Sequence, residues 1–278
     1  MTTTTTTTPG PARAESVPEP SRQRTPLLSR TWVRVALPVL VLVAAIGLWE
    51  LASISGWINP ITVPSASDTF GAMVQLTTES YFWEAAWVTL QETLYGFAIG
   101  ASLGLAIGAL TGTFAVFRVA IWPFVVAFQN TPRIALAPIF LTWFGFGMTS
   151  KVVMAAVICF FPVVINTVAG LASVDDNARL LFRTYGASTR QTFVRLTLPT
   201  AAPITFAGIK TALTLALLGA IVGEFVGASE GLGVLINEFN FQLEVALAFG
   251  VVMYLAVIGL ILYGLIELVE KKLITWSN

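Results

Sequence analysis

The stretch VVMAAVICFFPVVINTVAGLA, residues 152–172, contains no charged side chain and has the length of one transmembrane helix. A helix needs about 20 apolar residues to cross the hydrocarbon core of a bilayer. Runs of this kind recur on both sides of it, so the sequence predicts an all-α polytopic membrane protein with six spans. These spans are Val33–Ile54, Trp87–Leu110, Val119–Phe144, Val152–Ala172, Ile204–Val226 and Val245–Val269.

The composition supports this fold class and excludes several functions. Of the 278 residues, 56% are hydrophobic and 11% are charged, against about 25% charged residues in soluble domains. The chain has no His and one cysteine, Cys159, which excludes imidazole catalysis, Cys/His zinc sites and an intrachain disulfide. Fifteen basic and fifteen acidic residues balance to zero, which gives no electrostatic reason to expect nucleic acid as a partner.

The N-terminal region differs from the rest of the chain. Residues 1–31 are rich in Thr and Pro and poor in apolar side chains, so they cannot bury enough surface to offset the entropy of ordering. We expect a disordered cytoplasmic tail over residues 1–31 and a transmembrane domain over residues 32–278.

The basic residues orient the predicted spans, because Lys and Arg are retained on the cytoplasmic side. They precede the first span, lie between spans two and three and between spans four and five, and follow span six. The opposite loops carry acidic residues, and Lys151, between spans three and four, is the exception. Both termini are therefore predicted to be cytoplasmic.

The second span carries glycines at every fourth position, namely Gly96, Gly100, Gly104, Gly108 and Gly112. Such a smooth face lets helices approach closely in a membrane. Packing within the chain and a subunit interface both fit the pattern, and we favour packing within the chain.

The third span is interrupted by polar residues. Gln129, Asn130, Thr131 and Arg133 surround Pro132, and proline disrupts a helix by removing an N–H donor. Polar groups and irregular backbone are tolerated at this depth inside protein or beside a hydrated cavity. This segment is a candidate translocation pathway, and Arg133 could instead snorkel to a boundary or pair with Glu92 or Glu224.

The loop between spans four and five contains two helix-start signals. Ser173 with Asp176 and Ser188 with Gln191 match the capping-box spacing. We expect one short helix that ends at Gly186 and a second that ends at Pro199. The first helix offers Leu181, Phe182 and Tyr185 as an apolar patch ringed by arginines. An amphipathic helix on lipid headgroups and a docking element for a soluble partner both fit this patch.

Here the sequence resembles a known family. Gly186 followed after nine residues by Leu196-Thr197-Leu198-Pro199 matches the cytoplasmic EAA loop of permease subunits in binding-protein-dependent ATP-binding-cassette (ABC) importers. Segments 131–138, 143–147, 207–210, 223–225 and 231–233 resemble the nitrate, sulfonate and taurine branch. The resemblance covers about residues 35–270. The Glu-Ala-Ala triplet of the family falls on Leu180-Leu181-Phe182, so the acidic contact that the family makes with its ATPase cannot come from Leu180.

The resemblance implies a MetI-like type I importer fold whose coupling loop covers about residues 173–199. Its expected partners are a second permease subunit, as a homodimer, two ATPase subunits and an extracytoplasmic solute-binding protein, in the cytoplasmic membrane of a prokaryote. ATP and Mg would be bound by the ATPase, and this chain would carry no cofactor of its own. The predicted coupling residues are Asp175, Asp176, Leu181, Phe182, Tyr185, Gly186, Ala187, Ser188, Leu198 and Pro199. The predicted pathway residues are Gln129, Asn130, Thr131, Arg133 and Glu224.

Two other functions compete with an importer permease. The chain lacks a phosphate-binding Gly-x-x-x-x-Gly-Lys loop, so it supplies no ATP-driven motor of its own. A self-contained channel or secondary transporter would need a coupling-ion site. Its carboxylates at membrane depth, Glu50, Glu92, Glu224 and Glu267, lie mostly near span ends. An intramembrane enzyme would need a base beside Ser102 or Cys159, and none is evident. For the importer, Arg133 and the branch favour an anionic solute such as nitrate, a sulfonate, an aromatic acid or a pyrimidine-like compound.

Overall fold

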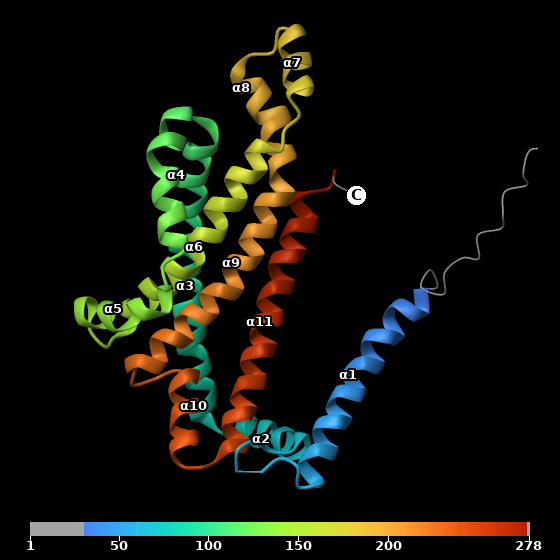
Figure 1. The fold of residues 1–278 in the computed structure, drawn as a ribbon, viewed down its shortest axis with the longest axis vertical. Helices are drawn as coiled ribbons and strands as arrows, with labels where there is room; N and C mark the ends of the chain where they lie inside the picture. The colour runs from blue at the N-terminus through green and yellow to red at the C-terminus, as the bar shows by residue number, and fades with distance from the viewer. Residues whose placement is uncertain (1–30, 60, 277–278) are drawn as a thin grey trace, which may run out of the picture. The chain divides into compact units, whose positions relative to one another are not determined.

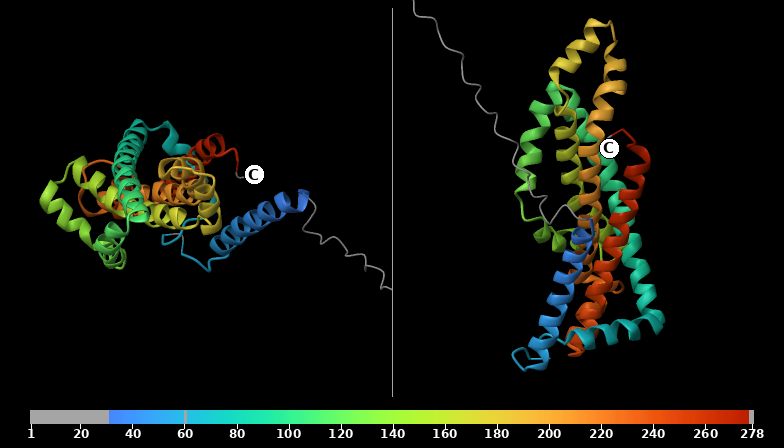
Figure 2. Two further views of the ribbon diagram at one scale, coloured as in Figure 1. Left: turned by 90° about the horizontal axis from the view of Figure 1, so that it is seen from above. Right: turned by 90° about the vertical axis from the view of Figure 1, so that its right-hand side faces the viewer.

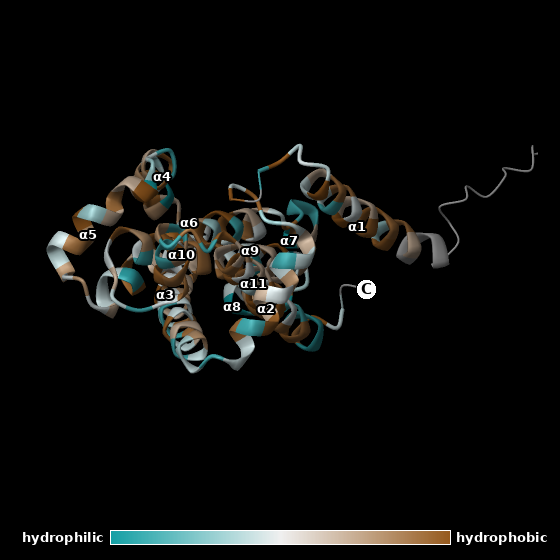
Figure 3. Cartoon of the chain, turned by 90° about the horizontal axis from the view of Figure 1, so that it is seen from below, coloured by the Kyte–Doolittle hydropathy of each residue, from teal (hydrophilic) through white to brown (hydrophobic). Residues whose placement is uncertain are grey.

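The computed structural model describes residues 31–59 and 61–276, and every secondary-structure element among them is helical. A boundary between two structural units falls inside α1, between Leu48 and Trp49, so the two units are described separately. The predicted tail lies outside the described residues except for Thr31, where α1 (Thr31–Ile54) begins. Figure 3 shows hydrophobic residues along most of α1.

The second unit begins with the last turn of α1, which is tied to α2 (Ala66–Thr78). The Glu50 carboxylate accepts hydrogen bonds from the backbone N–H and the hydroxyl of Ser67, at 3.0 and 2.7 Å. Ser65 caps α2 by accepting from the Asp68 N–H. The sequence analysis missed α2, although Ser65 and Asp68 have the spacing of a capping box.

The glycine stripe packs within the chain. It lies on α3 (Ser80–Thr113) and faces α6 (Met148–Ala172). A Cβ at Gly104 would lie 2.8 Å from Val163 Cβ, and one at Gly108 would lie 2.7 Å from Thr167 Cβ. The two backbones approach too closely for any side chain larger than hydrogen. The stripe therefore serves packing between helices of one subunit, as we favoured.

The third span is broken. It consists of α4 (Ala115–Gln129), the 3₁₀ helix η2 (Arg133–Leu136) and α5 (Ala137–Phe144), and the chain bends by 89° between its two halves. The predicted interruption at Pro132 is confirmed. α5 leaves the direction of α4 about halfway along the bundle (Figure 1).

The remaining helices complete the bundle. α9 (Leu198–Gly227) packs along α6 and α3, and α11 (Val245–Leu273) packs along α9. α10 (Leu232–Phe241), which the sequence analysis missed, packs on α11 and α3. Leu76, Phe82, Leu232 and Val251 are nearly inaccessible and form the centre of this end of the core.

By length and hydropathy, five described helices can cross a membrane, or six if the bent pair counts as one span. All six predicted spans coincide with these helices, with longer ends in α3 and α9. Within the second unit, α7 and α8 project at one end, whereas α2 and α10 lie at the opposite end (Figures 1 and 2).

Candidate functional site

The first helix of the coupling loop, α7 (Asp176–Thr184), begins two residues later than predicted. Asp175 is its N-cap and accepts the Asn177 N–H at 3.1 Å. Ser173 closes α6 instead, with its hydroxyl donating to the Gly170 carbonyl at 2.8 Å. The prediction of a Ser173–Asp176 capping box was wrong, because Ser173 satisfies the orphan carbonyls of the preceding helix.

The glycine corner has the predicted geometry. Gly186 has a φ of +74°, the left-handed conformation that a Cβ penalises. The Ala187 N–H donates to the Phe182 carbonyl at 3.0 Å, and the Gly186 N–H donates to the Arg183 carbonyl at 2.9 Å. These two bonds form a Schellman motif, which ends α7 at a defined angle.

The second helix begins as predicted and ends elsewhere. Ser188 and Gln191 form the complete capping box of α8 (Thr189–Thr192). The helix then continues through the π-helical segment η3 (Phe193–Thr197) into α9 without a break. The prediction that Pro199 ends this helix was wrong. Pro199 lies in the first turn of α9, where its missing N–H can be accommodated. The corner at Gly186 is therefore joined directly to a membrane-spanning helix.

The corner presents exposed apolar side chains. Leu181 is 54% exposed and Tyr185 is 82% exposed. A hollow of about 410 Å³ runs between them and the corner, lined by Leu181, Phe182, Tyr185, Gly186, Ala187, Gln191 and Arg195. Six of the ten predicted coupling residues, from Leu181 to Ser188, thus lie at or beside one surface. Leu198 and Pro199 lie further along, on α9.

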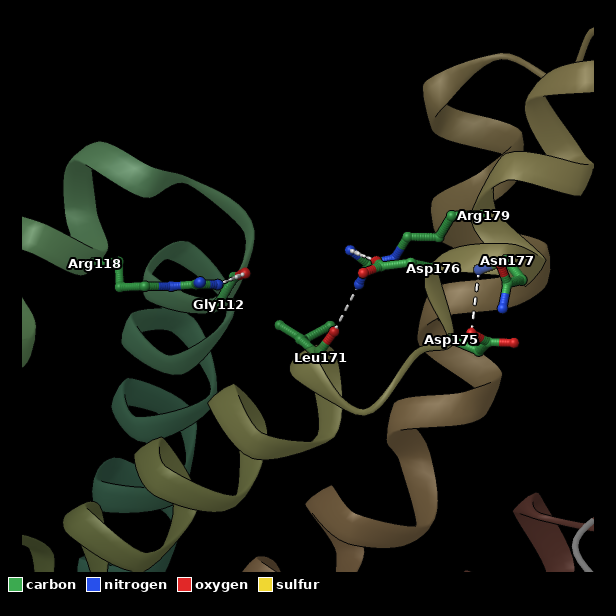
Figure 4. A network of polar contacts seen from close by, with 7 residues as sticks. All are labelled: Gly112, Arg118, Leu171, Asp175, Asp176, Asn177 and Arg179. Atoms are coloured by element: carbon green, nitrogen blue, oxygen red, sulfur yellow. Dashed lines mark hydrogen bonds and ion pairs between the residues drawn. The ribbon is translucent and has the colours of Figure 1, made fainter.

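Hydrogen bonds hold the base of the coupling loop (Figure 4). Arg179 donates to the Leu171 carbonyl at 3.0 Å and lies 3.8 Å from the Asp176 carboxylate. Apart from the loop in the same view, Arg118 of α4 donates to the Gly112 carbonyl of α3 at 2.9 Å and joins these two helices at their turn. The Asp176 side chain is 95% exposed, so its carboxylate remains accessible to another molecule beside Arg179. Leu180, at the family's acidic position, is also exposed.

The predicted pathway residues of span three lie at the break between α4 and η2. Thr131 and Arg133 line a cavity of about 470 Å³ between the broken span and α3 and α6. Asn130 donates its side-chain amide to the Val126 carbonyl at 2.9 Å, and so caps the end of α4. Gln129 contributes its carbonyl, 3.5 Å from the Arg133 guanidinium.

Arg133 is half-buried and is held by neutral groups. Its guanidinium lies 5.0 Å above the Phe161 ring and donates to the Ile158 carbonyl at 3.2 Å. The ion pairs among residues 31–59 and 61–276 do not include Arg133. The Arg133–Glu224 pair that the sequence analysis considered is therefore not formed in this structure.

Glu224 belongs to a separate buried cluster. It is 1% exposed, and its carboxylate accepts from the Thr89 hydroxyl at 2.7 Å and from the Gly233 N–H at 2.5 Å. Thr89 in turn accepts the Leu232 N–H at 2.8 Å. A Cβ at Gly231, where φ is +122°, would overlap the Glu224 carboxylate. Glu224 thus fastens the start of α10 to α3 and α9, and it does not line the 470 Å³ cavity.

Glu92 and Lys151 are also buried in this region, each 2% exposed. The Lys151 ammonium donates to the carbonyls of Phe146 and Gly147, which hold it at the first turn of α6. Lys151 violated the charge pattern of the loops because it is not a loop residue. The sequence analysis missed Thr89, Gly231 and Gly233 as partners of Glu224. The short segment Gly231-Leu232-Gly233 was the available signal, since adjacent glycines allow close approach to a backbone.

The comparisons identify the class of protein that this fold and these sites define. The family model for the "binding-protein-dependent transport system inner membrane component" matches residues 96–275. The chain belongs to this family. It is an integral membrane permease subunit of an ABC importer.

Curated relatives cover nearly the whole chain. The formylaminopyrimidine transport permease protein ThiX of Halalkalibacterium halodurans is 34% identical over 87% of this chain and 96% of its own length. The riboflavin transport system permease protein RibX of Chloroflexus aurantiacus is 33% identical over 88% and 91%. The putative aliphatic sulfonates transport permease protein SsuC of Escherichia coli is 28% identical over 89% and 94%.

Solved structures show the same fold at lower identity. The crystal structure of an amino acid ABC transporter with histidines matches with a TM-score of 0.59 and 19% identity, over 73% of this chain and 98% of that chain. The inward-facing MetNI methionine ABC transporter matches with a TM-score of 0.55 and 20% identity, over 69% and 94%. The predicted MetI-like permease fold is confirmed.

Proposed function

We propose that two copies of this chain form the translocation pathway for a small anionic solute, which an extracytoplasmic binding protein delivers and two ATPase subunits drive. The family and the fold support the part of this proposal that concerns an importer permease. The observation that carries the mechanism is the Gly186 corner, where a capped α7 meets a helix that continues without a break into α9.

The corner is suited to transmit motion. A force applied at Tyr185 or Leu181 acts on α7, and the Schellman motif fixes α7 to the start of α8. Because α8, η3 and α9 form one helix, a displacement of the corner moves α9 as a rigid element. Glu224 lies in the last turn of α9, and its carboxylate accepts a hydrogen bond from the Gly233 N–H of α10. This contact is at the end of the bundle opposite the coupling loop. Closure of the ATPase subunits would thus displace helices at both ends of the pathway.

The exposed patch at the corner favours a protein partner over a lipid surface. α7 runs beside α8 at the end of the bundle in both side views, instead of lying across the helix axes (Figures 1 and 2). An amphipathic helix that rests on headgroups lies in the plane of the membrane. The 410 Å³ hollow beside Tyr185 therefore fits a protruding element of an ATPase subunit better than it fits lipid.

The expected orientation follows from the basic residues. The coupling loop carries four arginines, Arg179, Arg183, Arg190 and Arg195, and this concentration of positive charge favours a cytoplasmic position for that end of the bundle. Both termini then lie on the cytoplasmic side. A cysteine introduced at Ser188 in a Cys159→Ala background should react with a membrane-impermeant thiol reagent only in inside-out vesicles, and one at Ser229 only in right-side-out vesicles. The reverse pattern would overturn this orientation.

The proposal is tested by purification and transport. A soluble ATPase subunit co-expressed with this chain should copurify with it, and proteoliposomes holding the complex should take up solute only with both ATP and the binding protein. A channel or secondary transporter would move solute without either. Transport in proteoliposomes that contain this chain alone would overturn the proposed function.

A further inference from the structure

A cavity of about 260 Å³ lies at the base of the coupling loop. Gly112 and Thr113, at the end of α3, and Leu171, in the last turn of α6, line one side of it, and α7, α8 and η3 line the other. Figure 4 shows Gly112 and Leu171 at neighbouring helix ends, with Arg179 reaching from α7 to Leu171. The cavity thus separates the ends of two membrane-spanning helices from the loop that joins α6 to α9.

Two arginines of α7, Arg179 and Arg183, line this cavity. They are four positions apart, so their side chains lie on one face of the helix. Leu181 and Tyr185 each follow one of these arginines by two positions, which in a helix turns them by about 200° to the opposite face. The arginine face therefore stays uncovered when the exposed patch of Leu181 and Tyr185 contacts a partner protein.

Neighbouring carboxylates compensate the charge of these two arginines only in part. The Arg179 guanidinium donates to the Leu171 carbonyl at 3.0 Å, which holds it at the cavity wall, and it lies 3.8 Å from the exposed Asp176 carboxylate. The ion pairs among residues 31–59 and 61–276 do not include Arg183. Because a guanidinium carries five N–H donors, both side chains keep donors for a ligand.

Hydroxyl groups face the arginines across the cavity. Thr189 and Thr192 of α8 and Thr197 of η3 belong to its wall, and none of the described residues that line it is acidic. A planar guanidinium binds phosphate groups through paired hydrogen bonds. Basic pockets between membrane-spanning helices on the cytoplasmic side bind the headgroups of anionic lipids. The volume is just below the range of about 300–1,000 Å³ for small-molecule pockets, which suits a headgroup better than a larger ligand.

We propose that this cavity binds the phosphate group of an anionic phospholipid of the cytoplasmic leaflet, held by Arg179 and Arg183. The inference goes beyond the proposed function and takes from it only the orientation of the coupling loop. Phe114 and Val116, at the turn that follows Thr113, are exposed apolar side chains, and acyl chains of a bound lipid would cover them. A free phosphate would leave them bare. A bound lipid would join α7 to the ends of α3 and α6 and so stiffen the base of the coupling loop.

The test measures lipid binding to the purified, delipidated importer complex in a neutral detergent, by native mass spectrometry and by the shift in melting temperature. Its probes are dioleoyl phosphatidylglycerol, dioleoyl phosphatidylcholine and inorganic phosphate. One phosphatidylglycerol should bind per copy of this chain, at least about tenfold more tightly than phosphatidylcholine, whose quaternary ammonium would lie beside two arginines. Equal affinity of the two lipids would overturn the anionic class. Inorganic phosphate that stabilises the complex as much as phosphatidylglycerol would overturn the lipid source.

Variants of Arg183 separate a defined site from general attraction between charges. Arg183→Gln should weaken phosphatidylglycerol binding about fivefold, which corresponds to about 1 kcal/mol for one arginine near an anionic lipid. Arg183→Lys should retain more affinity. The matched control is Arg190→Gln, which removes a cation from the same loop outside the cavity, and it should bind the lipid as the unchanged chain does. Equal weakening by Arg183→Gln and Arg190→Gln, or none by Arg183→Gln, would overturn the site.

The outcome is independent of the general assignment. If the complex retains its ATPase subunits and imports solute, but phosphatidylglycerol binds no more tightly than phosphatidylcholine, the lipid inference is wrong and the permease function stands. If phosphatidylglycerol binds this chain alone and is lost from the complete complex, an ATPase subunit covers the cavity, and the inference is again wrong. Failure to recruit an ATPase would overturn the proposed function itself.

Discussion

The two ends of α9 stand in opposite physical states. Its first residues continue the coupling loop, where Tyr185 and Leu181 are exposed at an open hollow. Its last turn carries Glu224, which is buried and bonded on both carboxylate oxygens. Exposed apolar side chains at a rigid corner favour contact with a partner protein. A buried carboxylate whose two oxygens accept hydrogen bonds stabilises its own subunit. Substitutions at the Glu224 end should therefore lower the stability of the subunit, whereas substitutions at the coupling-loop end should impair coupling to the ATPase or association with it.

The largest effect is expected at Glu224. Glu224→Ala removes the acceptor of the Thr89 hydroxyl and the Gly233 N–H, and each buried donor left unsatisfied costs about 1–3 kcal/mol. The variant should lose thermal stability and yield in detergent, as measured by fluorescence-detected size-exclusion after heating. Glu230→Ala, an exposed neighbour, is the control. Equal melting temperatures for Glu224→Ala and Glu230→Ala would show that the hydrogen bonds of Glu224 do not stabilise the subunit.

At the other end, Gly186→Val should abolish coupling and spare the fold. The left-handed φ penalises a Cβ by about 1–2 kcal/mol, while no neighbouring atom lies within 4 Å of the added Cβ. The corner should open, so that ATP hydrolysis continues and uptake is lost. Gly71→Val on α2 has equal space and an ordinary φ, and it serves as the control. Normal uptake in Gly186→Val would refute the role of the corner.

The exposed patch should matter for association alone. Leu181→Ser and Tyr185→Ser remove apolar area that is already in water in the isolated chain, so each should leave the melting temperature unchanged. Each should weaken ATPase binding by about 1.5–3 kcal/mol if the side chain is fully covered by the partner. Titration of the ATPase onto immobilised permease measures this. Val116→Ser, an exposed site on α4 at the same end, should bind the ATPase normally.

The smallest effects are expected at the two aspartates. If Asp176 replaces the family's acid, Asp176→Lys should weaken ATPase binding in a salt-dependent way, by about 1 kcal/mol or less for an exposed pair. Asp175→Asn keeps an N-cap group and should leave α7 intact, whereas Asp175→Lys removes the cap. If Asp175→Lys and Asp176→Lys each bind the ATPase with unchanged salt dependence, the acid has not been replaced by either residue.

Local signals in the sequence were sufficient to predict those features whose hydrogen bonds form within one short segment of the chain. The apolar runs predict the spans because membrane backbone must satisfy itself within a helix. Gly186 and the Ser188–Gln191 box were predicted because their bonds join residues at most five apart. Ser173 and Pro199 were misjudged for a related reason. Each matches a local rule, but Ser173 caps the end of α6, which stops at Ala172 as predicted, and α9 begins at Leu198, before the predicted start of its apolar run.

What the sequence by itself determined is the set of membrane spans, the glycine face of α3, the break at Pro132 and the corner at Gly186. The tertiary structure alone decided that the glycine face meets α6, that Arg133 stacks on Phe161, and that Glu224 bonds to Thr89. Thr89 and Glu224 are 135 positions apart in the chain. A buried polar group takes whichever partner packing brings within reach, and that choice depends on how α3, α9 and α10 come together, which no single stretch of sequence encodes.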